Sequence, residues 1–320
     1  MAVFICGTWA DWFWSSEIGR SGRFCKPCRQ TLLRAHVPSR HDLDSLPEPF
    51  SSFPLPAQIL LPDPAERNKA KHVETHVWTG AVPAGTFQRI DGNWFVAGPE
   101  FTFLNLAARL DVSELIAIGY EYCGTYAINP LNAESTSGMR AITTPQKLVR
   151  FLNQWDGARG VAKAKEALRY VHANSASPRE TEIHMRLSLS GHRGGYNLPL
   201  SLINHKVELD EVARRIYKRG SCRCDVFFPK INLDVEYNGK DHEGRMESDA
   251  ARAAALASMG IATLTVTKRQ YEDYLAMSGI VRSIAAAHGI YLNEKRTGYT
   301  TARAKLMMAL RDYSTAVNRR

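Results

Sequence analysis

The sequence predicts a mixed α/β (α+β) fold, in which a central mixed sheet is flanked by helices and preceded by a small mixed α/β domain. Segments of alternating apolar and polar residues, typical of strands, recur between segments of helical periodicity, and turn residues separate them. The chain has 320 residues, which is the length of about two domains. Of these residues, 44% are hydrophobic and 23% charged, as in ordinary globular proteins.

The first 71 residues are rich in proline. The prolines cluster between Pro38 and Pro64, among serine and aspartate residues, and proline opposes helix interiors and central strands. We therefore expect residues 1–71 to form an irregular, loosely packed extension. Cys25 and Cys28 form a Cys-x-x-Cys pair within it. A zinc site commonly takes two such pairs, so two reduced thiols are favoured over zinc.

Residues 72–174 are expected to form the small mixed α/β domain. Three strands are predicted from short apolar and aromatic runs; they cover residues 76–78, 86–90 and 93–96. Asp91 and Gly92 between the last two runs predict a hairpin turn. Four helices follow from apolar periodicity and from start and stop signals; they span about residues 99–110, 111–124, 144–152 and 161–172.

Residues 175–292 are predicted to form the larger domain, and a basic C-terminal helix follows over 293–320. Ser177 is a natural N-cap, Pro178 takes the first helical position and Glu180 lies three residues after the cap, so a helix begins here. A segment of mixed character follows at 207–217. Strand and helix patterns then alternate; they cover residues 222–228, 231–238, 245–259, 261–266 and 271–288.

The net charge favours an acidic partner. Lysine and arginine exceed aspartate and glutamate by nine, and nucleic acid is the commonest partner of basic proteins. No run approaches the ~20 apolar residues of a membrane-spanning helix, and the N-terminus lacks the basic start of a signal peptide. We therefore expect a cytoplasmic protein.

The strand over 231–238 carries an unusual row of polar side chains. By alternation, Asn232, Asp234, Glu236 and Asn238 share one face. A solvent-exposed strand would tolerate such a row, but aspartate is poorly suited to strands. The row is therefore a candidate site as well as a candidate solvated surface.

The preceding strand brings a further carboxylate to this face. If Pro229 and Lys230 form a two-residue turn, Asp225 lies opposite Asp234 and diagonal to Glu236, about 7–8 Å away. Like charges at this distance are unfavourable unless a cation lies between them. Mg²⁺ suits that position because it prefers carboxylates, water and phosphate as ligands.

Three further motifs lie in this region: Asp225-Val-Phe-Phe-Pro, Leu233-Asp-Val-Glu236-Tyr-Asn238-Gly239-x-x-His242 and Asp249-x-x-Arg252. Taken together, these motifs resemble the PD-(D/E)XK nuclease superfamily, and in particular the group similar to very-short-patch-repair endonucleases. The resemblance covers about residues 177–270 and implies a restriction-endonuclease-like fold. The region before it more weakly resembles an antitoxin-like domain of abortive-infection systems.

The resemblance implies roles for the acidic residues. Asp225 corresponds to the central ligand of Mg²⁺ or Mn²⁺, Glu236 to the second carboxylate, and Glu180 to the helix glutamate that assists the metal or its water. The ion would orient water, polarise the scissile phosphate and neutralise developing charge. Arg252 is expected to touch a DNA phosphate or to pair with Asp249 three residues before it.

One position departs from the family pattern. Asn238 stands where the superfamily usually has a lysine, and a neutral amide cannot supply positive charge to the attacked phosphate. Lys240 and His242 are near enough in sequence to compensate. His242 also fits a general acid/base role, because its pKa lies near neutrality; a surface residue at a helix start is the alternative.

Three hypotheses for function follow. The first is a metal-dependent endonuclease that hydrolyses DNA phosphodiester bonds, in phage or mobile-element defence. The second keeps the fold without the chemistry, as a DNA-binding regulator or antitoxin-like protein. The third is an interaction protein with a solvated carboxylate face. DNA is the expected partner, and a homodimer and a toxin–antitoxin partner are left open.

Overall fold

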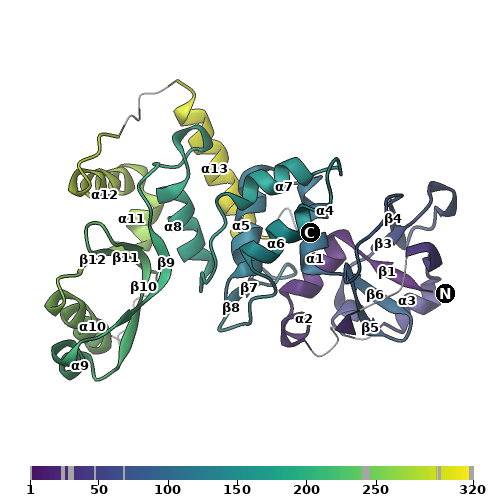
Figure 1. Ribbon diagram of the computed structural model, residues 1–320, viewed down its shortest axis with the longest axis horizontal. Helices are drawn as coiled ribbons and strands as arrows, with labels where there is room; N and C mark the ends of the chain where they lie inside the picture. The colour runs from purple at the N-terminus through teal and green to yellow at the C-terminus, as the bar shows by residue number, and fades with distance from the viewer. Residues whose placement is uncertain are drawn as a thin grey trace. The chain divides into compact units, whose positions relative to one another are not determined.

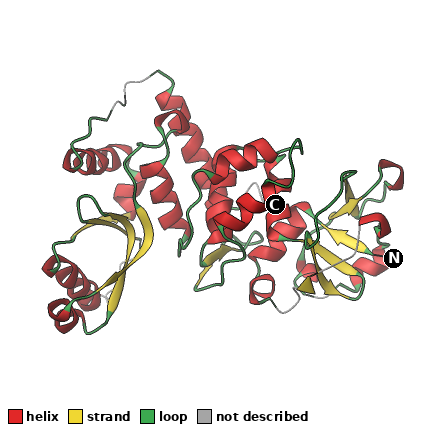
Figure 2. Cartoon of the chain, in the orientation of Figure 1, coloured by secondary structure: helices red, strands yellow, loops and turns green. Residues whose placement is uncertain are grey.

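The computed structural model describes residues 2–22, 26–27, 32–46, 48–67, 69–239, 246–292, 294 and 297–316. The chain divides into two compact units. Unit 1 comprises Met1–Ala173 and Ala309–Arg320, and unit 2 comprises Asn174–Met308. Both units combine helices with sheets (Figures 1 and 2), so the mixed α/β class is confirmed. Among the residues placed, no helix is long and apolar enough to cross a membrane.

Unit 1 contains a six-stranded mixed sheet. Its strands are β1 (Val3–Ile5), β2 (Lys26–Pro27), β3 (Ala57–Leu61), β4 (Val73–Val77), β5 (Phe87–Asp91) and β6 (Trp94–Ala97). Their order is β2-β5-β6-β1-β3-β4. β1 runs parallel to β6 and antiparallel to β3, while β3 and β4 are parallel. β4 is therefore an edge strand.

The first 71 residues belong to this sheet, which corrects the prediction of an irregular extension. β1 and β3 occupy central positions, and all their residues are buried. The prolines flank β3 and do not interrupt it: Pro56 precedes the strand and Pro62 follows it. The prolines therefore prevent regular secondary structure only in the segments that connect the strands. Because β3 pairs with β4, no domain boundary separates residues 1–71 from 72–174. Cys25 and Cys28 lie outside the described residues.

Helices and short elements complete unit 1. α1 (Gly7–Ser15) packs against β3, β6 and α4 (Pro99–Ala107).

The predicted hairpin is confirmed between β5 and β6. Asp91 pairs with Trp94, so Gly92, with φ 44°, and Asn93 form the turn. The four predicted helices are confirmed as α4 and the three that follow it. The remaining elements are α2 (Glu17–Ser21), α3 (Arg40–Asp44), α5 (Val112–Cys123), β7 (Tyr126–Ile128), β8 (Ser135–Ser137), α6 (Pro145–Leu152) and α7 (Val161–Leu168).

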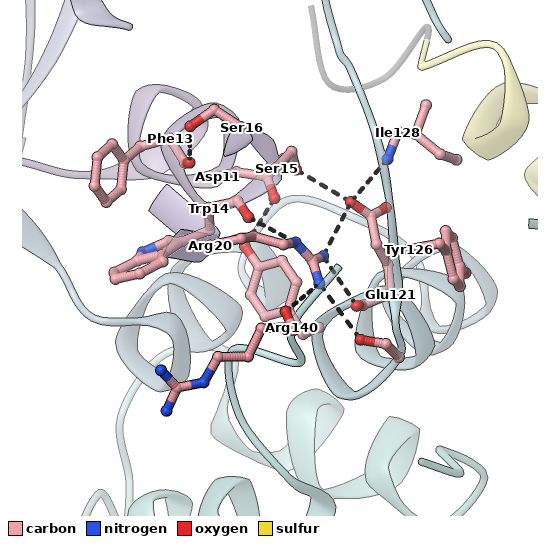
Figure 3. Close-up of polar contacts among 12 residues, drawn as sticks. Asp11, Phe13, Trp14, Ser15, Ser16, Arg20, Glu121, Tyr126, Ile128 and Arg140 are labelled. Atoms are coloured by element: carbon pink, nitrogen blue, oxygen red, sulfur yellow. Dashed lines mark hydrogen bonds and ion pairs between the residues drawn. The ribbon is translucent and has the colours of Figure 1, made fainter. Parts of the chain in front are cut away.

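A buried arginine joins α2 to α5 in unit 1 (Figure 3). The Arg20 guanidinium donates through Nε to the Trp14 carbonyl (3.2 Å), through Nη1 to the carbonyls of Gly124 (3.4 Å) and Arg140 (3.0 Å), and through Nη2 to the Glu121 carbonyl (3.0 Å). It also lies 3.8 Å from the Glu121 carboxylate. Every nitrogen of this buried cation therefore has an acceptor.

Unit 2 is built on a four-stranded mixed sheet of order β12-β11-β10-β9. Its strands are β9 (Leu202–Glu208), β10 (Ser221–Phe228), β11 (Leu233–Asn238) and β12 (Ala262–Thr267). The first three are antiparallel neighbours, and β12 is parallel to β11. The helices are α8 (Pro178–Ser188), α9 (Glu211–Tyr217), α10 (Met246–Ser258), α11 (Lys268–Glu272) and α12 (Tyr274–Ala287). The last helix, α13 (Tyr299–Ser314), begins in unit 2, and its residues from Ala309 onward belong to unit 1.

Two apolar clusters form the core of unit 2. One joins α8 and α12 to β10, β11 and β12 through residues such as Ile183, Val281 and Val226. The other joins α9 and α10 to β9 and β10 through residues such as Leu256 and Cys224. Helices therefore cover both faces of the sheet (Figure 1). Of these elements, β9 was not predicted; its sequence lies mostly before the segment of mixed character.

Candidate functional site

Helix α8 fixes the position of Glu180. The Ser177 hydroxyl accepts from the Glu180 backbone N–H at 3.1 Å, and Pro178 takes the first helical position, as predicted. The Glu180 carboxylate accepts from the Ala176 backbone N–H at 2.8 Å. The side chain is therefore held at the N-terminus of the helix, and the residue is buried.

The pairing of β10 with β11 differs from the predicted one. Phe227 lies opposite Asp234, and Val226 lies opposite Val235. The recorded pairs end at Val226; one further step in the same register would bring Asp225 opposite Glu236, where Asp234 had been expected. The reason is the connection, which has four residues because Asn232 adopts φ 47° and extends the turn by two residues.

The side chains of β10 switch from one face of the sheet to the other near Asp225. Cys222 and Cys224 pack on the side of α10, whereas Val226 packs on the side of α8 and α12. Residues two apart in a regular strand share a face, so the alternation is shifted between Cys224 and Val226. In β9, Asn204 stands opposite this point and has φ 47°. Such local irregularities redirect single side chains and are frequent at functional sites.

The Asp225 carboxylate lies against the neighbouring strand. It accepts from the Tyr237 backbone N–H at 3.1 Å. Asp234 is completely buried on β11 and has the Cys224 thiol as a hydrogen-bond donor. The adjacent strands thus carry three carboxylates, with Glu180 of α8 close enough to Asp225 to raise its own pKa through charge repulsion.

Arg252 of α10 is the cation within this cluster. Its Nη1 donates to the Glu236 carboxylate, and its Nη2 donates to Asp234 at 3.2 Å and to the Arg223 carbonyl at 3.0 Å. The pairing with Asp249 that the sequence suggested is replaced by these contacts. Arg252 therefore serves as an internal counterion to two carboxylates of the site.

The pKa values of three carboxyl groups in this cluster are raised. Burial, together with the charge of Asp225, raises the pKa of Glu180 to about 8, against the hydrogen bond from Ala176. Burial likewise raises the pKa values of Asp225 and Asp234 to about 6, although Arg252 lowers both. Raised carboxyl pKa values in a shared site are typical of functional sites.

The other predicted site residues follow Glu236 along the chain. Asn238 is the last residue of β11 and is exposed, next to Thr267 of β12. Lys240 and His242 lie outside the described residues. The neutral amide at the end of β11 is therefore outside the buried part of the cluster.

The donor set was tested for its fit to a divalent ion. Within the described ranges, no three His, Cys, Asp or Glu side chains are arranged as a ready-made metal site. The oxygens of Asp225 and Glu236 are of the type that Mg²⁺ and Mn²⁺ prefer. Besides burial, repulsion from a neighbouring carboxylate raises the pKa values of Glu180 and Asp225, and a bound cation would offset that repulsion. The residues thus fit a divalent ion in chemical type.

Asp234 takes part in the site although the sequence indicated only its place on the polar face: burial of its carboxylate beside Arg252 makes it part of the charge balance. The contact of Arg252 with Glu236 depends on how α10 packs across β11. Only the alternation that places Asp234 on the same face as Glu236 hinted at the first of these.

The comparisons with known proteins add no relative. No protein-family model matches the chain, and neither the characterised proteins nor the solved structures yield a match. The interpretation of the site therefore rests on the residues themselves.

Proposed function

We propose that unit 2 is a nuclease that hydrolyses DNA phosphodiester bonds with the help of Mg²⁺ or Mn²⁺. The observation that carries the proposal is the cluster of Glu180, Asp225, Asp234 and Glu236, in which the pKa values of the first three are raised although Arg252 lies among them. Such a cluster is stabilised by a cation and is unfavourable without one.

The order of elements supports the proposal. Apart from β9 and α9, which stand between α8 and β10, the order along the chain is α8, β10, β11, α10 and β12, with Glu180 on α8, Asp225 on β10 and Glu236 on β11. The resemblance to the PD-(D/E)XK superfamily implies this sequence of helix and strands with these acids. A restriction-endonuclease-like fold for unit 2 is part of the proposal.

The residues suit distinct roles in hydrolysis. Asp225 and Glu236 would hold the ion, which when bound orients water and stabilises charge on the scissile phosphate. Glu180 has a pKa near 8, so it can accept and release a proton near neutral pH. The positive net charge of +9 favours association with a polyanion such as DNA.

The test is a plasmid-cleavage assay with the full chain. We expect cleavage in Mg²⁺ or Mn²⁺, and a loss of at least about 100-fold in Asp225→Asn and Glu236→Gln, because ligands and their supports each contribute that much. Glu247→Gln is the matched control, since it removes an exposed carboxylate from α10. Cleavage that survives both site substitutions would refute this assignment of the site.

A DNA-binding regulator is the second candidate, and two observations favour it. Arg252 already occupies the oxygens of Glu236 and Asp234, and Asn238 provides no positive charge. The same preparation separates the two functions. If no ion supports cleavage while binding to a DNA duplex weakens steeply with salt, the regulator is the better description.

A further inference from the structure

A pocket in unit 1, far along the chain from the carboxylate cluster, has the features of a ligand site. Its volume is about 840 Å³. Edge strand β4 and the segment after it form one wall, and the end of α4 and residues 154–159 form others. This volume lies within the range of about 300–1,000 Å³ that is usual for small-molecule sites.

Several polar atoms in the wall lack partners. The Nε1 atoms of Trp78 and Trp155, Nδ2 of Asn105 and Nε2 of His76 are buried, and each is without a hydrogen bond in the described part of the chain. Trp155 is only 5% exposed. The nearest acid to His76 is Glu74, 3.7 Å from Nε2, beyond hydrogen-bonding distance. Indole and amide N–H groups can only donate, so the complementary ligand must offer acceptors.

The charge of the pocket is positive. Arg67, Arg109 and Arg159 line it and are exposed, and no acid of the described ranges forms an ion pair with them. Asp156 is the single acidic residue of the lining, and Lys165 already neutralises it at 3.0 Å. Burial lowers the pKa of His76 although Glu74 raises it, and Arg109 lowers it again, so the ring is favoured in its neutral form, which offers one N–H donor and no charge. An anion is therefore the favoured occupant.

Aromatic surface accompanies the cations. Trp78 is half-buried in the wall, and its ring meets Trp155 edge-on, with centroids 4.8 Å apart. A side chain at Gly80 would place its Cβ 3.2 Å from Trp78 Nε1, so glycine at this position avoids a crowded contact with the indole. A flat ring can pack on exposed indole, while phosphate oxygens accept from N–H donors and arginines.

We propose that this pocket binds a nucleoside phosphate as a small-molecule ligand. The arginines and unpartnered donors would receive the phosphate oxygens, and the indole of Trp78 would pack against the base. An inorganic phosphate would fill only a small part of 840 Å³, which is why a phosphate joined to a larger planar group is favoured. The proposal concerns unit 1 alone and does not depend on nuclease activity.

The test is calorimetric titration of the full chain, in EDTA so that no metal-dependent cleavage contributes. The probes are ADP, GDP, CDP and UDP, beside inorganic pyrophosphate, adenosine and a short DNA duplex. We expect at least one diphosphate to bind at micromolar to low-millimolar concentration and more tightly than pyrophosphate or adenosine.

Two substitutions locate the binding. Arg109→Gln should weaken it by about tenfold, because a charged hydrogen-bond donor is lost, and Trp155→Phe should weaken it while keeping an aromatic ring in place. Arg150→Gln, on the exposed side of α6 and outside the lining, should bind as the unaltered chain does. Far-ultraviolet circular dichroism of each variant verifies that it is folded.

Several results would overturn the proposal. These are failure of all four diphosphates to bind the folded chain, pyrophosphate binding as tightly as the best of them, or equal weakening by Arg109→Gln and Arg150→Gln. Loss of duplex binding in Arg109→Gln, without diphosphate binding, would assign the surface to DNA.

Discussion

Each unit has an arginine beside acidic side chains, buried in unit 1 and partly exposed in unit 2, and the two arginines differ in how completely the charges are matched. In unit 1, the side chain of Arg20 is 2% exposed and that of Glu121 is fully buried. The Arg20 nitrogens donate to four backbone carbonyls, and the Glu121 carboxylate also accepts from the Ser15 hydroxyl and the Ile128 N–H (Figure 3).

The arrangement in unit 2 is less balanced. The side chain of Arg252 is 17% exposed and meets both Glu236 and Asp234, while Asp225 and Glu180 add two further carboxyl groups close by. Burial raises the pKa values of Glu180, Asp225 and Asp234, and repulsion between carboxylates adds to the rise for the first two. The Arg252 guanidinium lowers the pKa values of Asp225 and Asp234, but both stay above the ordinary value of an aspartate. Because the carboxylates of this cluster outnumber its arginine, the cluster can accept a bound cation.

This difference distinguishes an ion pair that stabilises the fold from a carboxylate cluster that is suited to binding a cation. A buried ion pair with all its donors satisfied holds its elements in place, and removal of one partner leaves the other without compensation. A cluster with surplus like charge costs stability in the absence of a ligand and gains most when a cation arrives. Mutations should therefore act in opposite directions in the two units.

The largest expected effect on stability is in unit 1. Arg20→Met should lower the free energy of unfolding by about 3–5 kcal/mol, because it leaves a buried carboxylate and several carbonyls unpaired. All six tryptophans of the chain lie in residues 9–155, so denaturant titration followed by tryptophan fluorescence reports on unit 1.

The matched control uses the same substitution at an exposed pair. Arg40 pairs with Asp44 at 3.1 Å, with side chains 60% and 62% exposed, and Arg40→Met should cost about 0.5 kcal/mol or less. If Arg20→Met is no more destabilising than Arg40→Met, the saturated network does not stabilise unit 1 as argued.

Local patterns predicted much of the fold. The cap at Ser177 and the alternation around Glu236 are properties of short segments, and α8 and β11 form where they indicate. The central strand β1 has three residues and gains its place from pairing with β6, more than 85 residues away in the chain. Such a strand is fixed by non-local pairing, which a short run of sequence does not encode.

For the candidate site, too, the sequence predicted the residues but not the contacts between them. The alternation placed the acids of β11 on one face, but the register depended on the backbone of Asn232, whose φ of 47° is one of several conformations open to asparagine in a turn. The contact of Arg252 with Glu236 depended on the packing of α10 across the sheet. Residue types were therefore visible in the sequence, and their partners were not.

A smaller effect, of opposite sign, is expected at the carboxylates. The pKa of Glu180 is raised from 4.5 to about 8 in the folded chain, so the folded state binds a proton that the unfolded state releases between these values. Stability of unit 2 should therefore fall as pH rises from about 4.5 to 8. Glu180→Gln removes this term and should stabilise unit 2 at pH 8 by at least about 1 kcal/mol, the equivalent of roughly one pKa unit.

Hydrogen exchange of peptides from β11 provides the measurement for unit 2. Protection in Glu180→Gln and in the unaltered chain is compared at pH 5 and at pH 8, with both proteins at the same pH. The gain should be present at pH 8, absent at pH 5, and reduced by millimolar Mg²⁺. A loss of protection at pH 8 would mean that the Glu180 carboxylate stabilises the fold and that the surplus-charge interpretation is wrong.

The smallest expected effect tests whether Arg252 and a divalent ion compete for the same oxygens. Arg252 donates to Glu236 and Asp234, so Arg252→Gln should bind Mn²⁺ about threefold more tightly, equivalent to about 0.7 kcal/mol, while lowering stability without the ion. Mn²⁺ titration by calorimetry measures the affinity, and Arg215→Gln is the control because Arg215 pairs with Glu211 at the exposed surface. Weaker Mn²⁺ binding in Arg252→Gln would show instead that the guanidinium positions the carboxylates for the ion, and a change of equal size in Arg215→Gln would show that net charge alone sets the affinity.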